Sequence, residues 1–112
     1  MRHEQTIAYQ KCVQLMVVTH SIIEHFPKGF AFLADQLRRS STSPARNFAE
    51  GYYQRSVRQQ RRFFEYAEQS VRETSASFDA ALAFKAAPGE LILQGKQVAL
   101  EVVKLLSGFQ RR

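Results

Sequence analysis

Apolar residues recur at helical spacing in four successive segments of this chain, and two Pro/Gly breakers, at residues 27–29 and 87–89, separate them. Strand signals are weak, because the sequence has no Asn-Gly or Asp-Gly hairpin dipeptide and no sustained alternation of apolar and polar residues. The predicted helices cover about residues 4–25, 30–51, 56–87 and 90–109. Helices of this length with short connections predict an all-α fold, an antiparallel up-down four-helix bundle.

The length and composition of the chain fit a single soluble domain over residues 1–112. A single cysteine, Cys12, excludes an internal disulfide and a cysteine-rich zinc site. No apolar run is long enough to span a bilayer, and the N-terminal segment is a poor signal peptide. We therefore expect a cytoplasmic protein that does not bind a membrane.

The third and fourth predicted helices each have a face that we expect to be buried. In the third, this face consists of Phe63, Ala67, Ser70, Val71, Thr74, Phe78, Ala81 and Leu82. In the fourth, it consists of Leu91, Gly95, Val98, Val102, Leu105, Leu106 and Phe109. The spacing of Ser56 and Gln59 predicts a capping box at the start of the third helix. Gly95 lies where another backbone could approach closely.

The first and fourth predicted helices carry more apolar residues than one core stripe requires. Val13 and Val17 lie away from the main apolar face of the first helix, and Ile92, Leu93, Leu100 and Val103 lie away from that of the fourth. Large exposed apolar patches are unusual on soluble monomers. We therefore expect these side chains to be buried against other copies of the chain in a homo-oligomer.

The second predicted helix contains a proline and a stripe of polar side chains. Pro44 lies inside this segment, and proline removes a backbone donor, so we expect a kink or break near residues 40–43. The polar stripe consists of Gln36, Ser43, Asn47 and Glu50. An active site is one interpretation of this stripe. We favour a structural polar seam between helices or subunits, because buried polar groups must find hydrogen-bond partners.

The net charge of +6 is concentrated in the middle of the chain. Between residues 38 and 62 there are seven arginines and one acidic residue, Glu50, whereas the remaining basic and acidic residues balance. The arginines are Arg38, Arg39, Arg46, Arg55, Arg58, Arg61 and Arg62. Guanidinium groups are planar, bidentate donors to phosphates and carboxylates, so this cluster predicts binding of nucleic acid, either RNA or DNA. The alternative is a solvated face with salt bridges.

The four arginines between residues 55 and 62 are the first candidates for nucleic-acid contacts. They lie at the start of the third predicted helix, opposite its apolar face. The three arginines between residues 38 and 46 come second, because some of them can form salt bridges between subunits. Tyr52 and Tyr53 lie beside the cluster, where they either stack on bases or pack in the interior.

Motifs for catalysis in a helical bundle are missing from the sequence. No glutamate has a histidine three residues later, as a di-iron site requires, and the sequence has neither His-Glu-x-x-His nor a Walker phosphate loop. Cys12 lies on an apolar face without a paired base, which is typical of a buried hydrophobic residue. We therefore expect no enzymatic activity, no cofactor, no metal and no small-molecule substrate.

A signature of basic, polar and small residues occupies positions 36–56. It reads Gln36-Leu37-Arg38-Arg39, then Ser43, then Asn47-Phe48-Ala49-Glu50-Gly51, then Arg55-Ser56. This signature resembles the Q-x-R-R, serine, N-I-A-E-G and R-S pattern of the four-helix bundle proteins known as 23S rRNA intervening-sequence proteins. Looser matches extend the resemblance over about residues 7–84. The family places its proline one position later than Pro44.

The resemblance implies a left-handed four-helix bundle, a cytosolic bacterial protein and a ring-shaped homopentamer without enzymatic activity. It also implies a link to nucleic acid, because some members are encoded inside inserted segments of rRNA genes. A related branch, the accessory proteins of diversity-generating retroelements, acts with nucleic acid. Residues and resemblance together predict a non-enzymatic, oligomeric RNA-binding protein with an arginine-rich surface. The alternative is a protein–protein interaction scaffold whose arginines pair with acidic partners or neighbouring subunits.

Overall fold

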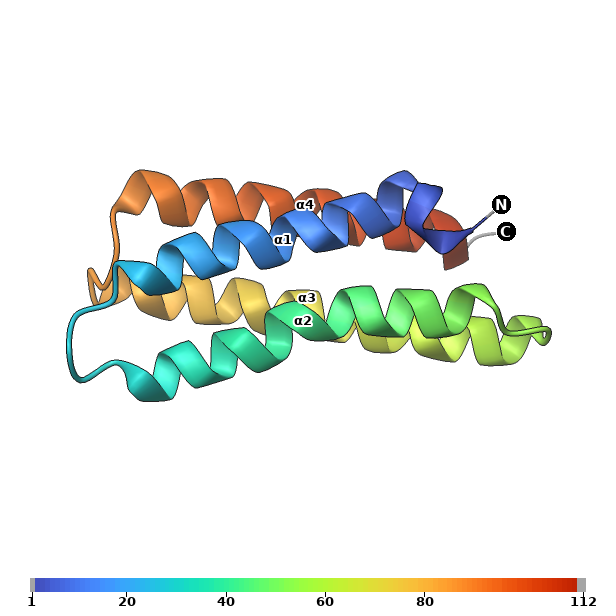
Figure 1. Cartoon of the computed structure of the whole chain (residues 1–112), viewed down its shortest axis with the longest axis horizontal. Helices are drawn as coiled ribbons and strands as arrows, with labels where there is room; N and C mark the ends of the chain where they lie inside the picture. The colour runs from blue at the N-terminus through green and yellow to red at the C-terminus, as the bar shows by residue number, and fades with distance from the viewer. Residues whose placement is uncertain (1, 111–112) are drawn as a thin grey trace.

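Within residues 2–110, the part of the chain that the computed structural model describes, all regular structure is helical. The elements in chain order are the 3-10 helix η1 (His3–Gln5), α1 (Ile7–Glu24), α2 (Ala31–Tyr52), α3 (Val57–Ala83) and α4 (Gly89–Gln110). The four α-helices run alternately up and down along a bundle with extents of 45 × 21 × 20 Å (Figure 1). The predicted all-α, antiparallel four-helix architecture is confirmed.

Side-chain caps fix the starts of two helices. The Oγ1 of Thr6 accepts a hydrogen bond from the backbone N–H of Tyr9, which starts α1 at residue 7. The prediction of one continuous helix over residues 4–25 is therefore wrong at its start, because Thr6 is extended and separates η1 from α1. At α3, the Oγ of Ser56 accepts a hydrogen bond from the N–H of Gln59, which is one of the two hydrogen bonds of the predicted capping box.

Helix α2 continues through its proline. We predicted a kink or a break near residues 40–43, and the break is absent, because Pro44 lies within the unbroken helix from Ala31 to Tyr52. Proline still removes one helical hydrogen bond, and Figure 1 shows α2 changing direction about halfway along its length. Pro44 is buried, so packing against the neighbouring helices stabilises the helix at this position.

Each helix contributes one apolar stripe to the centre of the bundle. Helix α1 packs against α2 and α4, and α3 packs against the same two helices. Fully buried side chains come from all four helices and include Leu15, Phe48, Phe78 and Leu106. Burial of a side chain of this size contributes about 1.5–3 kcal/mol, so these stripes supply most of the stability of the bundle.

Two glycines allow adjacent helices to approach closely. A Cβ atom at Gly95 would lie 2.9 Å from side-chain atoms of Ile22 and Phe78, so the close neighbours at this position are side chains and not the backbone that we predicted. A Cβ atom at Gly51 would lie 2.8 Å from the Cβ of Phe63. Both glycines are therefore required by packing between helices rather than by backbone conformation.

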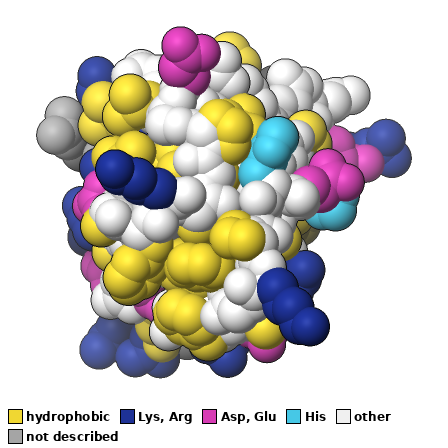
Figure 2. Space-filling model, turned by 90° about the vertical axis from the view of Figure 1, so that its left-hand side faces the viewer, with side chains coloured by type: hydrophobic (Ala, Val, Ile, Leu, Met, Phe, Trp, Pro, Cys, Tyr) yellow, Lys and Arg dark blue, Asp and Glu magenta, His cyan; other side chains and the backbone are white. Residues whose placement is uncertain are grey.

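Large apolar side chains also remain exposed. Phe32 and Phe84 are 57% and 56% exposed, and both contact the ring of Phe30. Hydrophobic side chains gather on the end of the bundle where the α1–α2 and α3–α4 connections lie (Figure 2). Within residues 2–110, no helix combines the length and apolar character that crossing a bilayer requires.

Candidate nucleic-acid interface

The four arginines predicted as first candidates lie at the end of the bundle where α2 passes into α3. Arg55 lies in the connection, and Arg58, Arg61 and Arg62 lie in the first two turns of α3. All four are exposed, because the buried stripe of α3 faces the opposite way. The Ser56 cap starts α3 at Val57 and so determines the direction in which these side chains project.

Three of these guanidinium groups surround one shallow hollow. Arg58, Arg61 and Arg62 line it together with Val57 and Glu65, and its volume is about 490 Å³. The only carboxylate in the lining belongs to Glu65, so the hollow is cationic. The charge, the open shape and the donor geometry of arginine suit a multivalent anion such as a phosphate backbone.

The three arginines of α2 lie on two sides of that helix. Arg39 lines a smaller polar hollow between α2 and α3 with Gln36, Ser40 and Glu73. Arg38 lines a separate hollow beside the α1–α2 connection. Arg46 is exposed, as are the other two. The structure therefore does not bring these three arginines together with the group at the start of α3 into one site.

Within residues 2–110, the arginine cluster makes a single ion pair. The Nη1 of Arg38 lies 3.2 Å from the Oδ1 of Asp35, and both side chains are more than half exposed. An exposed pair of this kind contributes little to stability. The other six guanidinium groups have no carboxylate within ion-pair distance in the described part of the chain, so carboxylates of residues 2–110 do not neutralise them.

Two of the four residues of the predicted polar seam lie in a hydrogen-bonded contact between α2 and α3. The Nδ2 of Asn47 donates to the Oγ of Ser43 at 2.8 Å, and the Oγ of Ser70 donates to the same Ser43 oxygen at 2.8 Å. Gln36 and Glu50 are exposed and lie outside this contact. The seam therefore joins two helices of one subunit, and its main function is to satisfy polar groups at their interface.

A second hydrogen bond extends the same seam. The Oγ1 of Thr74, which is fully buried, lies 2.9 Å from the Oγ of Ser40 and 2.8 Å from the carbonyl oxygen of Ser70. The contact between the Thr74 and Ser40 hydroxyl groups supports packing of α2 on α3.

The two tyrosines at the end of α2 occupy different environments. Tyr52 is partly buried, and its ring centroid lies 5.8 Å from that of Phe48 in the core. Tyr53 is 56% exposed. The hydroxyl oxygen of Tyr53 accepts a hydrogen bond of 3.2 Å from the backbone N–H of His3 and lies 3.0 Å from the Nδ1 of the same residue. Packing therefore accounts for Tyr52 but not for Tyr53.

Sequence reasoning missed two residues that shape this region. His3 contacts Tyr53 across 50 positions of sequence, and no spacing rule signals a contact of that kind. Glu68 is 9% exposed and accepts a hydrogen bond of 2.6 Å from the Oγ of Ser107, which joins α3 to α4. Its position four residues after Phe64 and three before Val71 places it on the buried stripe, and that signal could have identified it.

The single cysteine, Cys12, lies outside the cationic hollow. Cys12 is fully buried, and burial raises the pKa of its thiol to about 12. A thiol with that pKa is protonated at neutral pH and is a poor nucleophile. Among the described residues, no three His, Cys, Asp or Glu side chains gather as a metal ion would require.

Comparison with known protein families gives a match over most of the chain. The family model described as 23S rRNA-intervening sequence protein matches residues 4–108. This span includes all seven arginines of the cluster and the four α-helices almost to the end of α4. Among curated proteins, none matches the chain.

Proposed function

This chain belongs to the family of 23S rRNA-intervening sequence proteins, and on that premise we propose that it is a non-enzymatic, oligomeric RNA-binding protein. The description of the family refers to an intervening sequence of rRNA, which is compatible with a nucleic-acid partner. The proposed contact surface is the hollow at the start of α3, with the arginines of α2 as a secondary surface. Binding through this surface would be electrostatic and largely independent of sequence.

The observation that carries the proposal is the exposure of the arginines without carboxylate partners. A phosphate backbone gains affinity from each arginine that replaces condensed counterions. An arginine already paired with a carboxylate would have to give up that pair first. Because Arg58, Arg61 and Arg62 make no such pair within the described chain, they can contact phosphates without that cost.

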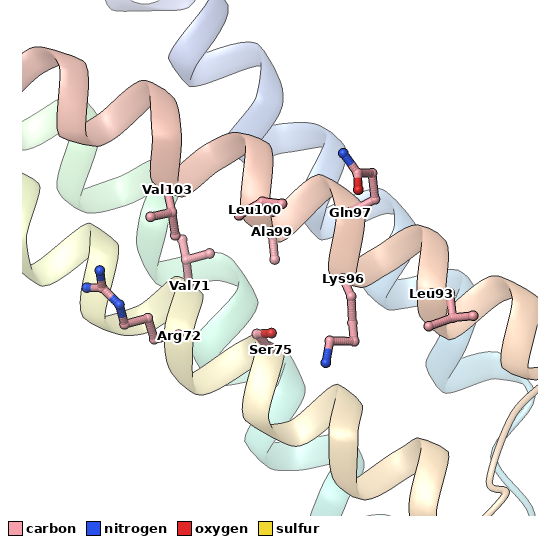
Figure 3. A pocket seen from close by; sticks show the side chains of 9 residues that line it. All are labelled: Val71, Arg72, Ser75, Leu93, Lys96, Gln97, Ala99, Leu100 and Val103. Carbon is pink, nitrogen blue, oxygen red and sulfur yellow. The ribbon is translucent and has the colours of Figure 1, made fainter.

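The oligomeric part of the proposal is supported by apolar surface on a different side of the molecule. Leu93 and Leu100 of α4 are 56% and 47% exposed. Val71, Leu93 and Leu100 line a largely apolar groove of about 600 Å³ between α3 and α4 (Figure 3). A second copy of the chain would remove this surface from water, and the family resemblance favours a pentameric ring in the cytoplasm.

The experiment that tests RNA binding is a salt titration with two charge-matched variants. In the first, Arg58, Arg61 and Arg62 are replaced by glutamine. In the second, the control, Lys11, Lys85 and Lys104 are replaced by glutamine, because these three line neither the hollow at the start of α3 nor the hollows beside Arg38 and Arg39. Binding of fluorescent RNA is measured between low and moderate salt for both variants and the original protein.

The arginine variant should bind less tightly and less salt-dependently than the control. Each phosphate contact to a single strand adds about 0.7 to the slope of log K against log salt, so losing three contacts should lower the slope by about 2. The lysine variant should retain most of the original slope. Undetectable binding at low salt, or equal losses in the two variants, would contradict the proposal.

The alternative function is a protein–protein scaffold that binds acidic partners through the same arginines. The exposed carboxylate-free arginines would suit an acidic peptide as well as a phosphate backbone. An acidic polypeptide that displaces RNA at equal charge concentration would favour this alternative.

A further inference from the structure

Tyr53 presents an aromatic side chain at the edge of the arginine cluster. It lies in the connection between α2 and α3, two residues before Arg55 and five before Arg58. Its side chain is 56% exposed, whereas that of Tyr52 is partly buried and packs against the core. An exposed aromatic ring within a few residues of exposed arginines provides the two kinds of group that single-stranded nucleic acids bind.

The N-terminal segment holds Tyr53 in place. His3 contacts the Tyr53 hydroxyl through both its backbone N–H and its Nδ1, at 3.2 Å and 3.0 Å. The rings of His3 and Tyr53 are 5.4 Å apart and nearly perpendicular, at 88°. The tyrosine is therefore anchored by its hydroxyl end, which reduces the conformational freedom it would lose when a ligand binds.

The aromatic neighbours of Tyr53 leave ring surface available for stacking. Tyr52 lies 5.3 Å away with its plane at 79°, so neither this ring nor that of His3 is parallel to Tyr53. Within residues 2–110, no aromatic ring is stacked face to face on it. A flat base could stack there, since base–aromatic stacking requires a parallel approach.

We propose that Tyr53 is a base-stacking group and that the ligand of the arginine cluster is therefore single-stranded rather than duplex. This inference rests on the proposed function, because the arginines must first bind the phosphate backbone. Bases in a duplex are stacked on one another and cannot lie on a tyrosine ring, whereas unpaired bases can. The α2–α3 connection would thus bind a base, and the first two turns of α3 the phosphates next to it.

The test compares two strands with equal numbers of phosphates, an oligouridylate and an abasic oligonucleotide. Three variants are measured on both: Tyr53→Ala, Tyr53→Phe and Phe84→Ala. The last is a matched control, because Phe84 is also 56% exposed but lies at the opposite end of α3. Circular dichroism checks that each variant is folded.

The expected result is a loss that depends on the presence of bases. Tyr53→Ala should weaken binding of the oligouridylate about tenfold, the loss typical of one stacked base, and leave binding of the abasic strand unchanged. Tyr53→Phe should retain most of the binding, because the ring remains, and lose only the smaller part that depends on the hydroxyl anchor to His3. Phe84→Ala should be unaffected. The original protein should bind the oligouridylate more tightly than a duplex that carries the same number of phosphates.

Tyrosine fluorescence gives a second readout, because the chain contains four tyrosines and no tryptophan. Binding of the oligouridylate should quench part of this emission in the original protein and less of it in Tyr53→Phe. Equal binding of the two strands, or equal losses on both in Tyr53→Ala, would overturn the stacking role while leaving the phosphate contacts intact. If neither strand binds the original protein at low salt, the proposed function fails as well.

Discussion

Burial determines the chemistry of the single cysteine. Cys12 is fully buried on the apolar face of α1, and desolvation of the thiolate raises the pKa of its thiol from 9.0 to about 12. The raised pKa belongs to the folded state alone, because an unfolded chain exposes the thiol to water. The difference between the two states makes the stability of the protein depend on pH in the alkaline range.

The direction of this dependence follows from the number of bound protons. Between pH 9 and 12 the unfolded thiol loses its proton while the folded thiol keeps it, so the unfolded state binds fewer protons and the free energy of unfolding falls as pH rises. The fall from this one group is about 1.4 kcal/mol per pH unit. Below pH 9 the contribution is constant.

The variant Cys12→Ala should lack this dependence. Chemical unfolding at pH 8, 9, 10 and 11 would give the free energy of unfolding of both proteins, measured at one protein concentration. Other titrating groups are shared, so the difference between the two curves reports the thiol. The original protein should lose stability more steeply than the variant above pH 9. If the free energies of unfolding of the two proteins changed in parallel with pH, the raised pKa of the buried Cys12 thiol would be contradicted.

At the scale of whole helices, the spacing between α4 and its neighbours depends on Gly95. An alanine there would place its Cβ 2.9 Å from the Cδ1 of Ile22 and 2.9 Å from the Cε2 of Phe78, and both of these side chains are fully buried. Overpacking of this kind costs about 1–3 kcal/mol, which exceeds the gain of up to about 1 kcal/mol from replacing glycine in a helix. We therefore expect Gly95→Ala to destabilise the bundle.

Gly108 provides the matched control in the same helix. Apart from the chain neighbours and the backbone of the same helix, no atom of residues 2–110 lies within 4 Å of a Cβ built at this position. Gly108→Ala should therefore stabilise the protein by up to about 1 kcal/mol through helix propensity. Urea unfolding of both variants at equal protein concentration measures the two effects. A Gly95→Ala variant as stable as the original protein would show that α4 does not pack as closely as the structure places it.

The number and order of the helices could be predicted from the sequence because breakers and helical spacing act locally. The orientation of each helix around its own axis could not be predicted as well. In α3, Phe64 is 2% exposed while the predicted core residue Phe63 is only partly buried. In α4, Ile92 is fully buried although we expected it outside the core face.

The physical reason for these errors is that both helices carry apolar residues over a wide arc. Where Leu91, Ile92 and Leu93 follow one another, spacing alone does not determine which of them faces the core. Contacts with the neighbouring helices decide, and Ile92 becomes buried while Leu93 remains exposed. Helix α1 begins at residue 7 and not near residue 4 as predicted, because its start is set by the Thr6 cap, and a single capping threonine is a weaker sequence signal than a proline or glycine.

The candidate site was partly predictable for the same reasons. The exposure of the arginines at the start of α3 follows from their position opposite the apolar stripe, and the structure places them there. The anchoring of Tyr53 by His3 depends on how the chain end folds back on the α2–α3 connection, a contact 50 residues apart. Tertiary contacts of this kind carry no local sequence signal.

At the scale of the molecule, charged and apolar surfaces lie in different places. The cationic hollow is formed by the first turns of α3, whereas the apolar groove involves the middle of α3 and the outer face of α4. On the other side of α4, Val17, Val18 and Val98 line a further groove between α1 and α4. If copies of the chain associate as we propose, the apolar surface on both sides of α4 would provide the contact without using the seven clustered arginines.

Charge placed on the outer face of α4 should therefore disrupt self-association. Each leucine buried between copies contributes about 1.5–3 kcal/mol, and a buried unpaired carboxylate costs more still, so Leu93→Glu combined with Leu100→Glu should dissociate the oligomer. Light scattering coupled to size-exclusion chromatography should show the variant at a mass near 12.9 kDa and the original protein at a multiple of it.

The control for this prediction is Phe32→Glu, which adds charge at a similarly exposed apolar residue on the end of the bundle. This variant should retain the mass of the original protein, because Phe32 lies outside both grooves beside α4. Circular dichroism should show equal helix content in all three proteins, since Leu93 and Leu100 lie outside the core cluster. An original protein that is monomeric, or a double variant that keeps its mass, would contradict α4 as the contact between copies.

RNA affinity provides the final comparison, because a ring gathers several cationic hollows on one assembly and a monomer has one. The dissociated variant should therefore bind long RNA more weakly than the original protein while binding short RNA equally well.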